Sequence, residues 1–370
     1  MSLFLLLFIP IVLAVGAFLL SKGKIDLREL AVQLGVTLLI VLVPYGIALY
    51  SKTSDTEIWN GVIASKDKST QHCCHPYCCQ TCESCTTDSK GNRSCHSYCC
   101  RTCYYHSNDV RWDAYSSNGE HVYSDSCNSP STSEPPRYTV IRIGEPTAVE
   151  HSYTNYIKGA PDTLLRRTGQ VERFKSKIPP YPEVYDLYRA QRFIGVNVKL
   201  PDPVGLNDRL SEINAKWGAK RKVNVTVIVV KETDQMYLEA LKEAWIGGKI
   251  NDIVVVVGLY DDAETIAWAG VVSWTPSEQI KVDLRNRILD MEKFGGYRLL
   301  TVIEEEVSTK FEHRRISEFE YLNASITPSS TFKLVLGIIV ILVNLGMILF
   351  FWINDPFDRT FRSSYNGFRY

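Results

Sequence analysis

Cysteine and histidine, the side chains best suited to metal binding or redox chemistry, gather in one short stretch of the chain. All eleven cysteines fall between Cys73 and Cys127, and ten of them fall between Cys73 and Cys103. The stretch repeats itself at an offset of 21 residues. Cys-His-Pro-Tyr-Cys-Cys-Gln-Thr-Cys, starting at Cys74, matches Cys-His-Ser-Tyr-Cys-Cys-Arg-Thr-Cys, starting at Cys95. Such a repeat indicates one small module in which each copy supplies the same set of side chains.

Zinc coordination is one chemistry that this pattern favours. Each copy contains Cys-x2-Cys, a spacing that places two thiolates on one tetrahedral ion. His75 and His96 recur at matching positions, and Cys85 of the first copy aligns with His106 of the second. An imidazole can replace a thiolate at zinc, whereas it cannot replace half of a disulfide. The predicted zinc ligands are Cys74, His75, Cys78, Cys79, Cys82, Cys85, Cys95, His96, Cys99, Cys100, Cys103 and His106.

Disulfide bonding is the alternative chemistry for the same cysteines. Residues 65 to 135 contain almost no apolar core, so a segment of this length needs cross-links of one kind or the other. The odd count of eleven leaves at least one cysteine unpaired under this interpretation. The two interpretations predict opposite states for the thiols, and the histidines favour zinc.

Three segments are apolar enough to place this module beside a membrane. Leu3 to Leu20, Leu30 to Tyr50 and Leu334 to Ile353 contain no charged residue. A helix needs about 20 apolar residues to cross the hydrocarbon layer, so each segment predicts a transmembrane helix. Asn344 lies near the middle of the third segment, where we expect it to hydrogen-bond to another span, of this chain or of a second copy. The lipid bilayer is therefore the first predicted partner.

Basic residues on two flanks of these spans predict the sidedness. They are Lys22, Lys24 and Arg28 in the link between the first two spans, and Arg359, Arg362 and Arg369 in the tail. Two spans separate the link from the tail, so both can lie in the cytoplasm, as the positive-inside rule favours. Residues 51 to 333 are then extracytoplasmic. Thiols in such compartments tend to oxidise, which favours disulfides.

Residues 137 to 222 predict a small subdomain of short strands and loops. Tyr138 to Ile143 alternates in hydrophobicity like a strand, and His151 to Tyr156 has the composition of an ordered loop. Leu206 to Trp217 carries apolar residues at helical spacing and predicts an amphipathic helix.

Residues 223 to 316 carry the clearest fold pattern. The predicted elements are a strand at 223–230, a helix at 236–245, strands at 253–257 and 265–274, a helix capped by Ser277, and a helix at 299–311. The second strand is apolar on both faces and so should be fully buried. This order predicts an α/β (α+β) sandwich around a mixed sheet, in addition to the three transmembrane helices and the small Cys/His-rich module.

The run from Tyr237 to Val257 resembles the core of the TPM domain family, which is named for thylakoid proteins, phosphatases and membrane proteins. A helix ends in a Trp-x-x-Gly turn at Trp245, and the polar pair Asn251 and Asp252 precedes an apolar strand. The resemblance covers about 90 residues and implies a domain tethered to a membrane on its extracytoplasmic side. The layout of the whole chain is also similar to uncharacterised membrane proteins encoded by tailed bacteriophages.

The same resemblance implies a candidate catalytic residue. Some TPM proteins are phosphatases or bind divalent metal, which places Asp252, together with Asp261 and Asp262, near such a site. Clustered carboxylates suit a hard cation. The sequence departs from the family after Trp268, where Ala-Gly-Val-Val-Ser-Trp replaces a Gly-Tyr-Gly-Leu-Glu-like turn. Asp252 is therefore the candidate, while Asp261 and Asp262 are better interpreted as a solvated turn.

These patterns divide the chain and narrow its function. The predicted parts are two transmembrane helices (1–50), the Cys/His-rich module (51–130), the mixed subdomain (137–222), the TPM-like domain (223–316), the third transmembrane helix (333–353) and a cytoplasmic tail (354–370). The 41 basic and 41 acidic residues balance, so nothing favours nucleic acid as a partner.

No phosphate-binding loop, nucleophile elbow or His-Glu-x-x-His motif occurs in the sequence. We therefore predict a non-enzymatic envelope protein that presents its extracytoplasmic domain and cysteine module for binding a protein partner or for structural assembly, with self-association through the spans as a further option. The alternative prediction is a membrane-tethered, metal-dependent, phosphatase-like hydrolase.

Overall fold

A computed structural model of the chain describes residues 3–21, 25–87, 91–125, 134–354 and 356. The basic residues Lys22 and Lys24, Cys127, and the basic tail from Arg359 to Arg369, lie outside these residues. The chain divides into two compact units. One comprises Met1–Asp55, Thr154–Leu164 and Ile316–Tyr370, and the other comprises Thr56–Tyr153 and Leu165–Arg315.

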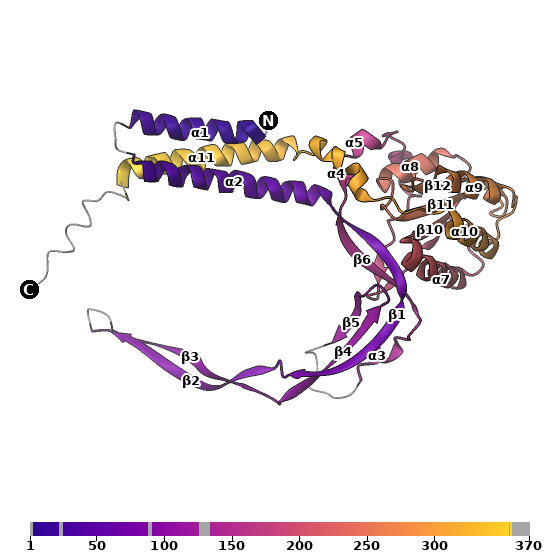
Figure 1. Cartoon of the computed structure of the whole chain (residues 1–370), viewed down its shortest axis with the longest axis horizontal. Coiled ribbons are helices and arrows are strands. Elements are labelled where there is room, and N and C mark those ends of the chain that lie inside the picture. Colours follow the sequence, from indigo (N-terminus) through magenta and orange to yellow (C-terminus); the bar gives the residue numbers. More distant parts are fainter. Residues whose placement is uncertain (1–2, 22–24, 88–90, 126–133, 355, 357–370) are drawn as a thin grey trace, which may run out of the picture. The chain divides into compact units, whose positions relative to one another are not determined.

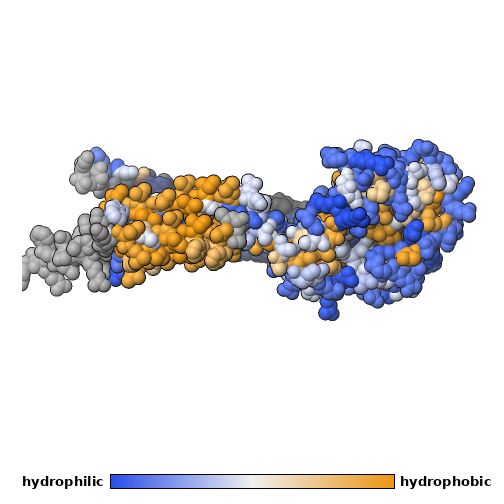
Figure 2. Space-filling model, turned by 90° about the horizontal axis from the view of Figure 1, so that it is seen from above, coloured by the Kyte–Doolittle hydropathy of each residue, from blue (hydrophilic) through white to orange (hydrophobic). Residues whose placement is uncertain are grey.

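The first unit is built on three long helices, α1 (Leu3–Leu20), α2 (Leu27–Thr53) and α11 (Ser330–Asn354) (Figure 1). All three are long and apolar enough to cross a membrane. Figure 2 shows apolar side chains over the surface of this helical bundle. Helices satisfy their own backbone hydrogen bonds, so a hydrocarbon layer can solvate such a surface. The three predicted spans are therefore helices of membrane-crossing length and composition. The unit also contains α4 (Tyr156–Gly159), α5 (Pro161–Leu164) and the 3-10 helix η1 (Ile316–Ser325).

A buried polar contact joins two of the long helices. The Gln33 side-chain amide and the Thr37 hydroxyl, both on α2, each donate a hydrogen bond of 3.0 Å to Asn344 Oδ1 on α11. The Asn344 amide donates in turn to the Val340 carbonyl, 2.9 Å away, and all three polar side chains are buried. The expected helix contact of Asn344 is thus confirmed within one chain.

Replacing this asparagine should loosen the bundle measurably. In Asn344→Leu the Gln33 amide and the Thr37 hydroxyl lose their shared side-chain acceptor in apolar surroundings. We therefore expect the unfolding free energy in detergent to fall by about 0.6–1.7 kcal/mol. Titration of the full chain with a denaturing detergent, followed by circular dichroism, measures this. Leu342→Ala is the matched control because Leu342 is 63% exposed on the same helix. Equal stability of Asn344→Leu and the wild type would show that the contact contributes nothing.

The second unit begins with an antiparallel sheet in the order β5-β4-β1-β6. Its strands are β1 (Ser54–His72), β4 (Asn108–Ser116), β5 (His121–Asp125) and β6 (Pro146–Thr154). β1 pairs with β4 along its second half, from Ile63 opposite Ser116 to His72 opposite Asn108. A small core that includes Ile63 and Ala114 lies against it. The sheet thus joins the two strands that flank the cysteine repeat, β1 and β4, to two later strands, β5 and β6.

Two local predictions were wrong in this region. Residues 138 to 143 are not a strand, because 138 to 140 belong to the short helix α3 (Pro136–Val140) and the rest is loop. Pro136 favours a helix start, and Tyr138 and Ile141, three residues apart, both face the core. The segment expected to form a loop from His151 onward belongs instead to β6, which ends at Thr154.

The mixed sheet expected in the last part of the chain is present, in the order β12-β11-β10-β9. Its strands are β9 (Phe193–Val196), β10 (Asn224–Lys231), β11 (Asp252–Leu259) and β12 (Ile266–Ser273). β9, β10 and β11 run parallel, and β12 runs antiparallel to β11. Every residue of β11 is buried, as its apolar sequence predicted. The coarse prediction of an α/β fold with a mixed sheet is therefore confirmed.

Helices cover both faces of this sheet. One face packs against α7 (Pro203–Arg221), α9 (Glu278–Leu289) and α10 (Gly296–Lys310), and the other against α6 (Val171–Phe174) and α8 (Met236–Ala244). Successive β10 residues face opposite sides of the sheet, so Val227 packs with the first set of helices and Ile228 packs with the second. Ser277 does stand before α9, but its side chain makes no capping hydrogen bond.

The remaining strands form two hairpins. β2 (Pro76–Thr87) pairs with β3 (Arg93–Tyr104), and the two-residue strands β7 (Val184–Tyr185) and β8 (Arg189–Ala190) pair with each other. The β2–β3 hairpin contains nearly the whole cysteine repeat and is the first part of the candidate site.

Candidate functional site

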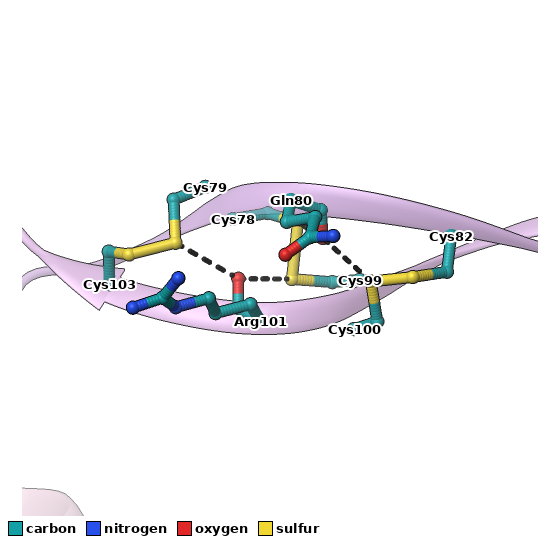
Figure 3. Close-up of a disulfide and its surroundings, with 8 residues drawn as sticks. All are labelled: Cys78, Cys79, Gln80, Cys82, Cys99, Cys100, Arg101 and Cys103. Carbon is teal, nitrogen blue, oxygen red and sulfur yellow. Dashed lines mark hydrogen bonds between the residues drawn. A yellow bond between two sulfur atoms is a disulfide. The ribbon is translucent and has the colours of Figure 1, made fainter.

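Four disulfides join β2 to β3. Figure 3 shows those formed by Cys78, Cys79 and Cys82 with Cys99, Cys103 and Cys100. The pairs are Cys78–Cys99, Cys79–Cys103, Cys82–Cys100 and Cys85–Cys95. Cys74 is disulfide-bonded as well. These nine cysteines were predicted as zinc ligands, and the prediction fails for all of them because a sulfur within a disulfide is not a thiolate. The disulfide alternative describes them correctly.

The pairing pattern explains why the sequence repeats. Each strand carries Cys-Cys-x-x-Cys. The first cysteine of one copy bonds the first of the other, Cys78 to Cys99. The second cysteine of each copy bonds the third of the other, which gives Cys79–Cys103 and Cys82–Cys100. Because the strands run antiparallel, the two identical motifs are related by a local two-fold axis, and every cysteine of one motif bonds a cysteine of the other. The 21-residue repeat thus encodes a symmetric set of cross-links.

Hardly any side chain of this hairpin is buried. Along β2 and β3 only Cys82, Cys85 and Cys103 are half-buried, and every other residue is exposed. A lone two-stranded hairpin is marginally stable in water, so the disulfides must supply the stability that a core would otherwise supply. Both faces of the hairpin are therefore free to contact another molecule.

A second constellation lies at the base of the hairpin, where β1 leads into β2 and β3 leads into β4. Cys73, His75, His106 and Asp109 place one potential ligand atom each within 4.8 Å of one another. Cys73 Sγ lies 3.8 Å from His75 Nδ1, which lies 3.3 Å from Asp109 Oδ2. His106 Nε2 contacts Asp109 Oδ1. This group of cysteine, histidine and aspartate side chains has the composition and spacing to bind a metal ion.

Electrostatics keep the aspartate of this cluster charged. The backbone N–H of Cys74 donates a 2.9 Å hydrogen bond to Asp109 Oδ2 and lowers the pKa of the carboxyl below its ordinary value, against the opposing effect of burial. Contact with His106 lowers the pKa further. Asp109 is 3% exposed, so a buried negative charge lies between two imidazole rings.

Two of the four residues in this cluster belong to the zinc ligands predicted from the sequence. His75 and His106 belong to the predicted ligand set, whereas Cys73 and Asp109 do not. Cys73 is the free cysteine among the described residues, and the odd cysteine count was the available indication that one thiol remains. His96 is exposed on β3 and belongs to neither of the two candidate metal-binding groups in the described part of the chain. The other group, around Glu83, uses two cysteines that are already paired.

Asp252, the candidate catalytic residue, lies elsewhere and is fully buried at the first position of β11. Its carboxylate accepts hydrogen bonds from the Asn224 side-chain amide (2.9 Å), the Lys249 backbone N–H (2.7 Å) and the Tyr181 hydroxyl (2.9 Å). Burial raises its pKa to about 6, although these hydrogen bonds act in the opposite direction. A cavity of about 480 Å³ is lined by Tyr181 and Lys249, and Asp252 is not among its lining residues.

The carboxylates grouped by the family resemblance do not meet. Asp252 begins β11, whereas Asp261 and Asp262 follow its other end, roughly 25 Å away by strand geometry. Asp261 is exposed and forms an ion pair with Lys231. Asp262 accepts hydrogen bonds from Thr265 and from the backbone of the turn, which lower its pKa to about 2. Both residues therefore form the solvated turn that was the preferred interpretation.

No protein-family model, curated protein or solved structure matches the chain. The resemblance to the TPM family thus rests on the run from Tyr237 to Val257, and the resemblance to phage membrane proteins rests on the layout of the chain. What the structure itself defines is a class: three apolar helices of membrane-crossing length, an α/β domain with a mixed sheet, and an exposed hairpin cross-linked by disulfides.

Proposed function

We propose that this chain is a membrane-anchored, non-enzymatic protein that presents its disulfide-bonded hairpin outside the cytoplasm to a protein partner. The observation that carries this proposal is the set of four disulfides in a hairpin without a core. Structural disulfides form and persist in oxidising compartments. The same sidedness follows from the basic flanks of the spans.

The surface chemistry of the hairpin suits binding. Cross-linking fixes its conformation in advance, which lowers the entropy lost when a partner orders it. Tyr77 and Tyr98 are 39% and 48% exposed, and Arg101 is exposed between them along the ladder. Tyrosine and arginine are enriched where interfaces bind most strongly. An exposed, rigid hairpin with such residues is better suited to contact than to catalysis.

The hydrolase alternative has weaker support. Asp252 is buried and its carboxylate already accepts three hydrogen bonds, so a substrate has no route to it without rearrangement. The TPM-like character of the α/β domain remains part of the proposal, as a scaffold for presentation. Zinc also remains part of it, but only for His75 and His106, because the predicted cysteine ligands are paired.

A site-specific cross-linking experiment tests the partner. With a photo-reactive residue at Tyr98 of the full-length protein in its native membrane, we expect one defined adduct. The matched control carries the same probe at Tyr260, which is 49% exposed in the α/β domain. The adduct should disappear when the hairpin disulfides are reduced before irradiation, because the presented conformation is then lost.

Three outcomes of the cross-linking experiment would contradict this function. They are the absence of any Tyr98 adduct, equal adducts at both positions, and an adduct that is insensitive to reduction. Protease added outside intact cells or spheroplasts should also cut the hairpin-bearing unit. Complete protection of that unit, with cleavage after lysis, would place it in the cytoplasm and end the proposal.

A further inference from the structure

We infer that Cys73, His75, His106 and Asp109 form a closed, four-ligand zinc site that clamps the base of the hairpin to the neighbouring sheet. The inference deepens the proposed zinc role of the two histidines by adding a thiolate and a carboxylate. It does not depend on the hairpin having a partner, because zinc binding is a property of these four side chains alone.

The local symmetry of the hairpin predicts a cross-link at its base, where these four residues lie. At the tip, Cys85 bonds Cys95. The repeat aligns Cys85 with His106 and Cys95 with Cys74. The symmetry-equivalent cross-link at the base would therefore join His106 to Cys74, which is chemically excluded because imidazole forms no disulfide. His106 instead contacts Asp109, beside His75 and the free thiol of Cys73. A metal bridge at the base would take the place of the disulfide found at the tip.

The spacing of the atoms agrees with one tetrahedral ion. With zinc–nitrogen and zinc–oxygen bonds of about 2.0 Å, two ligand atoms of a tetrahedron lie about 3.3 Å apart, and a sulfur and a nitrogen lie about 3.5 Å apart. His75 Nδ1 and Asp109 Oδ2 are 3.3 Å apart, and Cys73 Sγ and His75 Nδ1 are 3.8 Å apart. These two distances are within a few tenths of an ångström of the tetrahedral values, and all four potential ligand atoms lie within 4.8 Å of one another.

The donor set selects zinc among common ions. One thiolate, two imidazoles and one carboxylate are soft or borderline ligands, which calcium and magnesium do not favour. The thiolate and the carboxylate together balance the charge of a divalent ion. The hydrogen bond from Cys74 N–H orients Asp109, as supporting contacts around zinc ligands usually do. Four protein ligands leave no open position, so the site is structural and not catalytic.

The position of the site gives it a mechanical role. The β1–β4 ladder ends with His72 opposite Asn108, and the β2–β3 ladder begins with Pro76 opposite Tyr104. Between them the strands share two backbone hydrogen bonds of 3.4 Å, Cys73 to Ser107 and Tyr105 to His75. An ion held from both strands would fix the direction in which the hairpin leaves the sheet. It would also protect Cys73 from oxidation among the paired cysteines.

Metal analysis of the full-length protein in detergent tests the inference. After treatment with a chelator and titration with zinc, we expect one equivalent bound in the wild type. We expect at least ten-fold weaker binding in His106→Ala and in Asp109→Ala. His96→Ala is the matched control, because His96 is the repeat counterpart of His75 but lies outside the cluster. Intact mass with and without reduction must show the same disulfide count in every variant, so that misfolded protein is recognised.

Cobalt substitution provides a second measurement. The wild type loaded with cobalt should show the thiolate-to-cobalt charge-transfer absorption and the intense bands of a tetrahedral ion, and Cys73→Ser should lose the charge-transfer absorption. The inference is overturned if the wild type binds no zinc, if His96→Ala weakens binding as much as His106→Ala, or if the charge-transfer absorption is absent. Zinc binding without any cross-linked partner would leave the inference standing and remove the proposed function.

Discussion

Reduction of the disulfides should unfold the β2–β3 hairpin while the α/β domain of the same molecule stays folded. The hairpin buries almost nothing, and a two-stranded ribbon without a core is marginal in water. In the chain-entropy account, a bridge that closes a loop of 15–25 residues contributes about 3 kcal/mol, and three of the four bridges close loops of 18, 21 and 24 residues. Hydrogen exchange of the full chain in detergent, before and after reduction, measures the effect.

We expect backbone amides in β2 and β3 to lose their protection completely, and those in the buried strands β10 and β11 to keep theirs. Double variants that remove one disulfide at a time show which part of the hairpin each disulfide protects. Cys85→Ser with Cys95→Ser opens only the ten-residue tip, so increased exchange should stay near the turn. Cys79→Ser with Cys103→Ser releases a bridge near the base. Slow exchange throughout the reduced hairpin would show that the disulfides are not what holds it together.

The fold could be predicted from the sequence wherever a periodic pattern repeats over enough residues. The apolar spans, the buried strand β11 and the amphipathic helix α7 follow directly from hydrophobic length and spacing. The first sheet was harder because the β1 residues after Ile63 are mostly polar and exposed. They remain a strand because their backbone groups pair with β4, and pairing of that kind leaves no hydrophobic pattern to read.

The sequence predicted which kinds of residue make up the candidate site, but it did not predict which cysteines bond to each other. The sequence does not show whether a cysteine is in a disulfide, binds zinc or is free. Cys78 and Cys73 therefore could not be distinguished. Antiparallel pairing between the two copies of the repeat decides which cysteines meet, and this pairing is a property of the folded hairpin. Asp109 was missed because it follows the repeat and meets His75 only across the strand pair.

Truncation of Asp252 should cause the largest loss of stability in the α/β domain. Asp252→Ala leaves the Asn224 amide, the Lys249 N–H and the Tyr181 hydroxyl without their acceptor inside the protein. It also removes a negative charge that interacts favourably with buried Arg192. Arg192 donates a 2.9 Å hydrogen bond to the Asn224 side-chain oxygen, and burial lowers its pKa to about 10. Breaking a buried charged network costs about 3–5 kcal/mol, which we expect as the loss of unfolding free energy.

Asp261→Ala is the matched control, because that carboxylate is fully exposed and its ion pair with Lys231 contributes little. The pH dependence distinguishes a buried carboxyl from a surface one. The pKa of Asp252 is raised to about 6 in the folded protein from about 3.8. Its protonated form is therefore favoured by folding, and the associated stability is complete below pH 4 and is lost as the pH rises through 6.

The difference in unfolding free energy between the wild type and Asp252→Ala, the stability gap, should accordingly become smaller between pH 4 and pH 7. The corresponding gap between the wild type and Asp261→Ala should not change in that way. Chemical denaturation of the full chain in detergent at several pH values, followed by tryptophan fluorescence, gives both gaps. A gap that widens with pH would mean that the charged carboxylate is the stabilising form and that Arg192 acts as its direct counter-ion. Equal stability of Asp252→Ala and the wild type would mean that the carboxylate is not needed to hold the network.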